Sequence, residues 1–214
     1  ASLGAKVLQV RSVEMAMVHG VRTFVRSSFD DPESINSKEG SNDPVGTLIC
    51  DEEEIVEREV VTGIAYSKDE AQISLRRVPD KPGISASIFG PLADAHINVD
   101  MIVQSVSEDG SKTDMTFTVP ETDAVKAVQV LEDQKGSIAF ENIQSDTGLS
   151  KISVIGIGMR SHAGVASTAF SALAEKNINI RAITTSEIKF SLLIDADYTE
   201  LAVRTLHAVY GLNK

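Results

Sequence analysis

The spacing of apolar positions changes repeatedly along the chain after residue 70. Apolar residues at every second position are typical of a strand with one buried face, whereas spacings of three and four are typical of an amphipathic helix. These periods predict four strands and two helices in the order β-α-β-β-α-β, the ferredoxin-like arrangement. The strands are expected at 71–77, 97–106, 112–119 and 137–144, and the helices at 80–95 and 121–133.

A second unit of the same kind follows, but it is one strand short. It is expected to contain strands at 151–157, 178–186 and 188–194, and helices at 164–175 and 199–210. The apolar segment 59–66, directly before the first unit, is left over. Because an unpaired sheet edge invites aggregation, we expect this segment to supply the missing strand.

The two units share a sequence pattern. DKPGISASIFGPLADAHINVD begins at Asp80, and SHAGVASTAFSALAEKNINIR begins eighty-one positions later. Gly83 and Gly164 fall where a strand turns into a helix, which predicts exposed backbone N–H groups at the positive end of each helix. Pro91, inside the first helix, predicts a bend or early unwinding there.

Strict alternation along the predicted strand 97–106 places two sets of side chains on opposite faces. The apolar set is Ile97, Val99, Met101 and Val103, and the polar set is Asn98, Asp100 and Gln104.

Before residue 59 the pattern is weaker. It predicts a helix that stops at Gly20, with Leu3, Val7, Val10 and Met17 on one face, then strands at 21–29 and 45–50. A polar linker at 30–44 and an acidic run at 51–59 separate these elements. We expect the apolar faces of residues 1–49 to pack on a surface outside that segment.

Composition disfavours several classes of function. Hydrophobic residues make up 42% and charged residues 24%, as in ordinary globular proteins, and the net charge is −11. That charge disfavours nucleic acid and anionic membranes as partners, and no apolar run approaches the ~20 residues of a membrane span. The single Cys50 fits a reducing compartment, so a cytoplasmic location is expected. The four histidines lack metal-ligand spacing, and we expect no metal site.

The segments DKPG, INVDMIVQ and NINIRAITTSEIKFSLLI resemble the tandem ACT domains that regulate aspartate kinase. GAKVLQVRSVEMA, VRTFVRSSF and GTLI resemble the closing segment of that enzyme's kinase domain. The resemblance implies an α+β fold of two ferredoxin-like βαββαβ ACT domains, the second completed by a strand from before the first, preceded by a partial α/β kinase-domain segment. The implied bounds are 1–49 for the kinase segment, 67–145 for the first ACT domain, and 59–66 with 150–214 for the second.

The resemblance also implies a function. ACT domains bind small effectors between paired domains, and in aspartate kinases L-threonine and L-lysine inhibit the ATP-dependent phosphorylation of L-aspartate. The implied partners are these amino acids, a second copy of the chain in an ACT-mediated homodimer, and a full-length catalytic subunit. Because the sequence shows no phosphate loop, we expect this chain alone to be inactive and without a cofactor. Lys6 would approach ATP, with Mg²⁺, only in the complete enzyme.

The resemblance assigns the effector contacts by position. In the first unit they fall on Asp80, Gly83, Ser85, Asn98, Val99, Asp100 and Gln104, and in the second on Val165, Ala166, Asn179, Ile180, Ser186 and Glu187. We hypothesise that backbone donors at the turn 83–85 receive the effector carboxylate. Asp100, Gln104 and backbone carbonyls would receive the ammonium and the polar side chain. Ala166 stands where relatives often carry threonine, so a hydroxyl contact is missing there.

Five of the candidates also have a structural interpretation. Asn98 and Asn179 are suited to turns, and Asp80 is suited to capping a helix. On an open sheet face, Gln104 is more often a solvated residue or a dimer contact, and Glu187 is consistent with an ion pair. The alternative function is an assembly or stability subunit that pairs through its ACT sheets without binding an effector.

Overall fold

The computed structural model describes residues 8–29, 46–49, 60–108, 110–156 and 164–212. The chain forms two compact units, residues 1–58 and 59–214. The expected linker at 30–44, the acidic run at 51–59, Cys50 and His162 lie outside the described residues.

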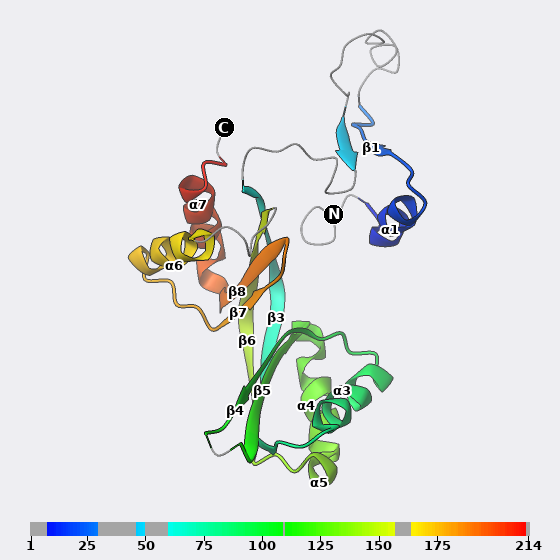
Figure 1. Ribbon diagram of the computed structural model, residues 1–214, viewed down its shortest axis with the longest axis vertical. Coiled ribbons are helices and arrows are strands. Elements are labelled where there is room, and N and C mark those ends of the chain that lie inside the picture. The colour runs from blue at the N-terminus through cyan, green and yellow to red at the C-terminus, as the bar shows by residue number, and fades with distance from the viewer. Residues whose placement is uncertain (1–7, 30–45, 50–59, 109, 157–163, 213–214) are drawn as a thin grey trace. The chain divides into compact units, whose positions relative to one another are not determined.

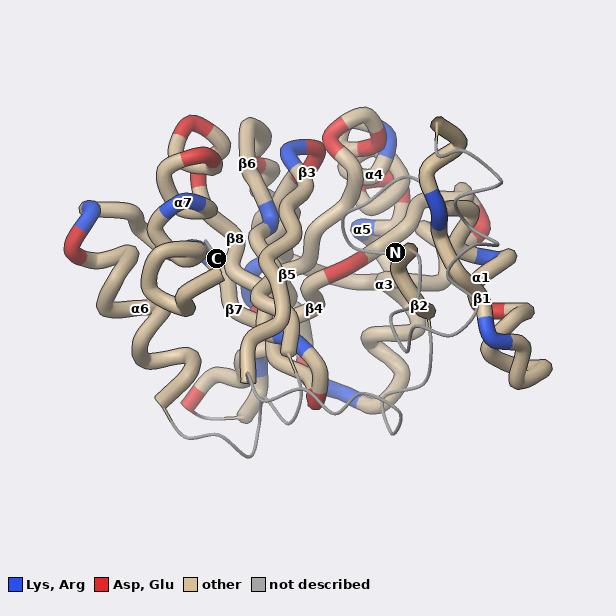
Figure 2. Tube along the Cα trace, turned by 90° about the horizontal axis from the view of Figure 1, so that it is seen from above, with Lys and Arg blue, Asp and Glu red and all other residues tan. Residues whose placement is uncertain are grey.

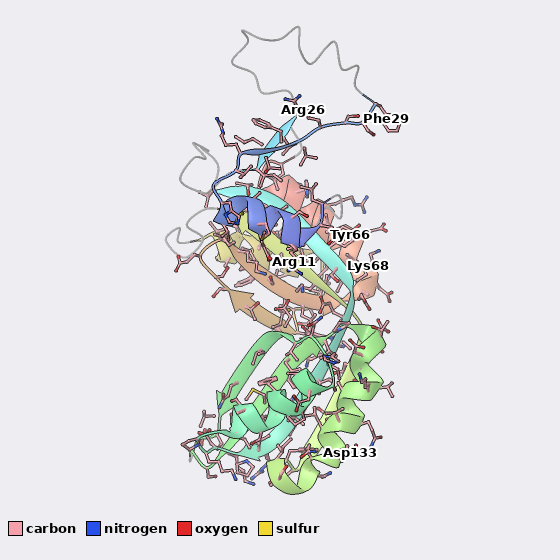
Figure 3. The ribbon with its side chains drawn as sticks, turned by 90° about the vertical axis from the view of Figure 1, so that its right-hand side faces the viewer. Arg11, Arg26, Phe29, Tyr66, Lys68 and Asp133 are labelled. Atoms are coloured by element: carbon pink, nitrogen blue, oxygen red, sulfur yellow. The ribbon has the colours of Figure 1, made fainter. Side chains whose placement is uncertain are left out.

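The first unit contains a helix and a two-stranded sheet. Helix α1 (Val10–Val18) is followed by Gly20, whose φ is +62°, and β1 (Thr23–Val25) pairs antiparallel with β2 (Thr47–Ile49). The predicted helix and both strands are therefore present, although each is shorter than expected. No residue of α1 is buried, and Phe29 is 97% exposed (Figure 3).

The second unit is organised around two long antiparallel strands, β3 (Val61–Pro79) and β6 (Asn142–Gly156) (Figure 1). They lie at the centre of a six-stranded sheet with the order β4-β5-β3-β6-β8-β7. The other strands are β4 (Asp100–Val106), β5 (Lys112–Val119), β7 (Ala182–Thr185) and β8 (Lys189–Asp195).

Both halves of this sheet have the ferredoxin-like strand order. In one half β3 is the first strand and β6 the fourth, and in the other half the two exchange roles. Residues 61–67 of β3 pair with 151–156 of β6, whereas residues 71–79 pair with β5. The early segment thus supplies the fourth strand of the second half, as predicted. The segments 59–66 and 71–77, expected as separate strands, contribute to one continuous strand, β3. The segments 137–144 and 151–157 likewise contribute to one strand, β6.

The helices cover two separate apolar cores. Helices α3 (Ile84–Asp94) and α4 (Ala124–Asp133) pack on the first half-sheet, and α6 (Val165–Glu175) and α7 (Thr199–Val209) pack on the second. Short 3₁₀ turns, Glu121–Asp123 and Ala196–Tyr198, precede α4 and α7. Figure 1 shows the two helix pairs at opposite ends of the β3–β6 ribbon. Figure 2 shows basic positions along these two central strands.

The strands expected at 97–106 and 178–186 begin later, at Asp100 and Ala182, and two other predicted elements differ from the structure. Residues Lys135–Ile138 form a helical turn, α5, in place of the start of a strand, because Ile138 is fully buried in the first core. The chain then turns at Ala139, whose φ is +58°, and β6 begins only at Asn142. Helix α3 also continues past Pro91 to Asp94 without unwinding. A proline removes only one helix hydrogen bond, and the fully buried Ile88 and Leu92 anchor α3 to the core on either side of it.

The predicted alternation along β4 fails after its first residue. Asp100 pairs with Thr118, but Val103 pairs with Thr116, so the strand contains one extra residue, and Met101 has a φ of +46°. A bulge of this kind moves every later side chain to the other face. Ile97 and Val99 face the first core, whereas Met101 packs against strands of the second half-sheet.

Candidate functional site

A hollow of about 570 Å³ lies at the start of α3. Its lining consists of the turn and first helical residues, 80–86, together with Gln104 from β4. Four of the seven residues predicted for the first unit are therefore brought together: Asp80, Gly83, Ser85 and Gln104. Lys81, Pro82, Ile84 and Ala86 also line the hollow and were not predicted. The sequence signal that could have identified these four residues is their position beside Gly83.

Gly83 fixes the backbone at this hollow. It is the N-cap of α3 with φ of +90° and ψ of −7°, a left-handed conformation that costs glycine little. Its carbonyl accepts the first helix bond, from Ser87 N–H at 3.0 Å. The N–H groups of Ser85 and Ala86 precede that bond, so no helix carbonyl is available to them. Donors at the positive end of a helix are suited to a carboxylate.

Asp80 does not cap the helix. Its N–H donates to the carbonyl of Ser111 at 3.0 Å, while α3 has no side-chain cap. The capping interpretation is therefore wrong, and the exposed residues Asp80 and Lys81 both line the hollow. A lining with one acidic and one basic residue is suited to a ligand that carries both charges.

Gln104 reaches the hollow because of the bulge in β4. It pairs with Met115, whose side chain lies in the first core, so both side chains point to the helix-covered face of the sheet. The expectation that Gln104 shares a face with Asp100 is wrong. A side-chain amide supplies both a donor and an acceptor.

The other predicted residues of the first unit lie away from the hollow. Asn98 is exposed, and Val99 packs against the first core. The Asp100 carboxylate lies 2.7 Å from the Lys151 ammonium and accepts the Met101 N–H at 2.8 Å. Burial would raise the pKa of Asp100, but these hydrogen bonds and the charges of Lys151 and Lys189 outweigh it, so the pKa lies below its usual value.

A second hollow, of about 540 Å³, lies at the start of α6. It is lined by Val60, Val61, Gly164, Val165, Thr168, Val209 and Tyr210. Val165 is the only predicted contact that it contains. The Tyr210 hydroxyl donates to the Val165 carbonyl at 2.7 Å, and burial raises the pKa of Tyr210 to about 12.

The remaining predicted residues of the second unit are dispersed. Ala166 and Ile180 pack against the second core, and Asn179 is exposed. The Ser186 hydroxyl donates to the Lys189 carbonyl at 3.2 Å, in the turn that also holds the exposed Glu187. The structure therefore gathers the first predicted set far better than the second. Lys6 lies outside the described residues.

Across the described ranges, no three His, Cys, Asp or Glu side chains are grouped so as to hold a metal ion. In the same part of the chain, no helix is long and apolar enough to span a membrane.

The sequence model of the ACT domain matches residues 76–134 and 152–210, more than half of the chain. The chain belongs to the ACT-domain family. The two matched ranges begin in β3 and β6, the strands that open the two half-sheets. The structure thus contains a tandem pair of ACT domains.

The ACT pair is similar to that of aspartate kinases. The aspartate kinase of Pseudomonas putida is 48% identical over 214 residues, which cover the whole chain and 49% of the relative. The chain therefore spans about half the length of this kind of relative.

Two solved structures of aspartate kinase subunits are also similar. A crystal structure of aspartokinase alpha and beta subunits has 48% identity and a TM-score of 0.66, covering 71% of this chain and 99% of the other. The ligand-free regulatory subunit of aspartate kinase from Thermus thermophilus has 38% identity with the same TM-score and coverages. The chain corresponds to the regulatory portion of aspartate kinases.

Proposed function

We propose that this ACT pair binds a free amino acid, L-threonine or L-lysine, in the hollow at the start of α3. In the complete enzyme, this binding would inhibit the ATP-dependent phosphorylation of L-aspartate. The proposal rests chiefly on one observation: the Gly83 turn, Asp80, Ser85 and Gln104 line a single hollow.

The groups at this hollow match those of an amino acid. The helix-start N–H groups, with Lys81 beside them, receive the carboxylate. Asp80 receives the ammonium in place of Asp100, which is paired with Lys151. The Ser85 hydroxyl and the Gln104 amide remain for a polar side chain.

The lining favours threonine as the first effector to test. A threonine hydroxyl can both donate to and accept from Gln104, whereas a lysine side chain would bring a second ammonium near Lys81. L-lysine remains the second candidate. It would bind best where its side chain extends away from Lys81 toward solvent.

The assembly of the complete protein is also part of the proposal. Two copies of the chain would pair through their ACT domains, and the pair would associate with a catalytic subunit that carries the kinase active site. This chain alone would then have no kinase activity. Supporting the proposal, the relatives include a structure with alpha and beta subunits of aspartokinase.

A thermal-shift measurement on the chain tests the proposal, with D-threonine as the matched control. A ligand at one hundred times its Kd stabilises a folded protein by about 2.7 kcal/mol. We expect L-threonine to raise the Tm and D-threonine to leave it unchanged. An unchanged Tm with both L-threonine and L-lysine would favour the alternative of an assembly subunit without an effector.

A further inference from the structure

Three charged side chains meet where the two ACT domains join. The Lys151 ammonium lies 2.9 Å from the Glu70 carboxylate and 2.7 Å from the Asp100 carboxylate. The Lys151 and Glu70 side chains are only 15% and 8% exposed, so this ion pair is largely removed from water. Charges buried to this extent are stable only when they are paired.

This cluster lies near the middle of the β3–β6 ribbon, at the point between the two ACT domains that we call the waist. The register of the ribbon shifts twice around Glu70, between Ser67 and Glu70 and again between Glu70 and Gln72. Before the shifts, residues 61–67 of β3 belong to the sheet of the second ACT domain. After them, residues 71–79 belong to the sheet of the first. Because such irregularities bend and twist a strand pair, the angle between the domains is set at this waist.

Strand β4 connects the waist to the candidate effector site. Its first residue, Asp100, binds Lys151, and Met101 is 97% buried against Leu149 and Leu193 on the central and second-domain strands. Its fifth residue, Gln104, lines the hollow. At a rise of ~3.3 Å per residue, the two ends of this segment are about 13 Å apart. Strand β4 therefore contacts both the hollow and the second domain.

The contacts at the start of β4 also store strain. Met101 has a φ of +46°, which a non-glycine residue adopts only when its surroundings enforce it. Here the Asp100 carboxylate bonds the Met101 N–H, and the buried methionine side chain holds the residue from the other side. The strained conformation of Met101 is therefore held partly by contacts with the second domain.

We propose that Glu70, Lys151 and Asp100 form a latch between the two ACT domains, through which ligand binding at the α3 hollow alters their relative orientation. In this arrangement Asp100 is a positioning residue that acts through Lys151. Lys151 remains charged at neutral pH. Burial would lower the pKa of Lys151, but its hydrogen bonds to Asp100 and Glu70 outweigh burial and raise it. The latch has two roles in this proposal. Its signalling role, which is to transmit ligand binding, rests on the proposed function. Its domain-fixing role, which is to hold the relative orientation of the two ACT domains, does not.

The test compares a latch variant with a matched control in the full chain. The Glu70→Gln/Lys151→Met variant removes the two least exposed charges together and leaves no buried carboxylate unpaired. The control, Lys112→Met, removes a lysine whose ion pair with Glu141, at 3.5 Å, lies within the first ACT domain. Spin labels at Val125→Cys and Glu200→Cys, both 85% exposed, report the interdomain distance in a Cys50→Ser background. Calorimetry measures the affinity for L-threonine and L-lysine.

We expect a narrow distance distribution in the unsubstituted protein and in Lys112→Met, and a shift of that distribution when effector binds. In the latch variant the distribution should be broad and should not respond to effector. The affinity should stay within about twofold, since Lys151 does not line the hollow. A merely structural ion pair would lower the Tm but leave the effector-induced shift in place, which would overturn the proposal.

The outcome remains decisive if neither amino acid binds the unsubstituted protein. In that case the proposed function fails, and the signalling role falls with it. The spin-label distance distributions measured without ligand then test the domain-fixing role alone. Broadening in the latch variant but not in Lys112→Met would support it, and equal widths in all three proteins would refute it.

Discussion

Gly83 and Gly164, eighty-one positions apart, adopt the same left-handed conformation at the starts of α3 and α6, with φ of +90° and +99°. The equivalence continues to the ends of these helices, where His96 and Asn177 have φ of +57° and +54°. Both helix ends close with the same backbone hydrogen bonds. The Ile97 N–H donates to the Leu92 carbonyl, and the Ile178 N–H donates to the Leu173 carbonyl, each at 3.0 Å. The internal repeat of the sequence is thus a repeat of backbone conformation.

Alanine at either turn glycine should destabilise the protein. An added Cβ at Gly83 or Gly164 would meet no atom within 4 Å, so the cost is conformational and not a clash. We expect Gly83→Ala and Gly164→Ala each to reduce the free energy of unfolding by about 1–2 kcal/mol in urea denaturation. Gly136→Ala, at a helical position without positive φ, is the control and should be neutral or stabilising by up to ~1 kcal/mol. Equal effects at all three positions would contradict this account.

The two ACT domains should unfold as one cooperative unit, because β3 and β6 run through both. All three tyrosines, Tyr66, Tyr198 and Tyr210, lie in the second domain or its borrowed strand, and the chain has no tryptophan. Phe117 is fully buried in the first core, so Phe117→Ala should cost about 3–5 kcal/mol. We expect this substitution to lower the unfolding midpoint reported by tyrosine fluorescence. An unchanged tyrosine midpoint would show that the domains unfold independently.

Removing Lys151 alone should be more damaging than removing it together with Glu70. Lys151→Met leaves the Glu70 carboxylate buried without its cation, and such a loss typically costs about 3–5 kcal/mol. Glu70→Gln/Lys151→Met leaves no lone buried charge, so much of the stability should return. Urea denaturation of the two variants measures the difference. A double variant no more stable than Lys151→Met would argue against a buried ion pair.

The ion pair of Asp100 predicts a dependence of stability on acid pH. Because the folded-state pKa of Asp100 lies below 3.8, its contribution is present above that pH and is lost as the pH falls through the folded pKa. Asp100→Asn should therefore be less stable than the unsubstituted protein at pH 7, by up to ~1 kcal/mol for this half-exposed carboxylate. The gap between the two proteins should close below pH 3.8. A gap that stays constant from pH 7 to pH 3 would rule out this linkage.

The sequence predicted the fold in those parts where a local pattern determines it. The 81-residue repeat and the missing strand correctly indicated two ferredoxin-like units and the segment that completes the second. The turn at Gly83 was equally predictable, because the glycine directly precedes an amphipathic run. The turn depends on residues close together in the chain, and the completing strand was found by counting the strands of the two units, although it pairs with residues about ninety positions away.

The features that could not be predicted depend on contacts between distant residues. Nothing near Met101 in the sequence marks a bulge, yet this single extra residue separates Gln104 from Asp100. Likewise Lys151 meets Glu70 and Asp100 only because the long strands bring the two domains together. The helical turn at 135–138 is stabilised by burial of Ile138, which a local pattern does not reveal.

The most direct test of the central claim is calorimetric titration of L-threonine and L-lysine into the unsubstituted chain and into Gln104→Ala. Gln129→Ala, on the exposed surface of α4, is the matched control. We predict saturable binding to the unsubstituted chain and the control, and a loss of roughly tenfold in affinity in Gln104→Ala, equivalent to one hydrogen bond. Binding that is equally tight in all three proteins would place the effector elsewhere, and an absence of binding in all three would contradict the account.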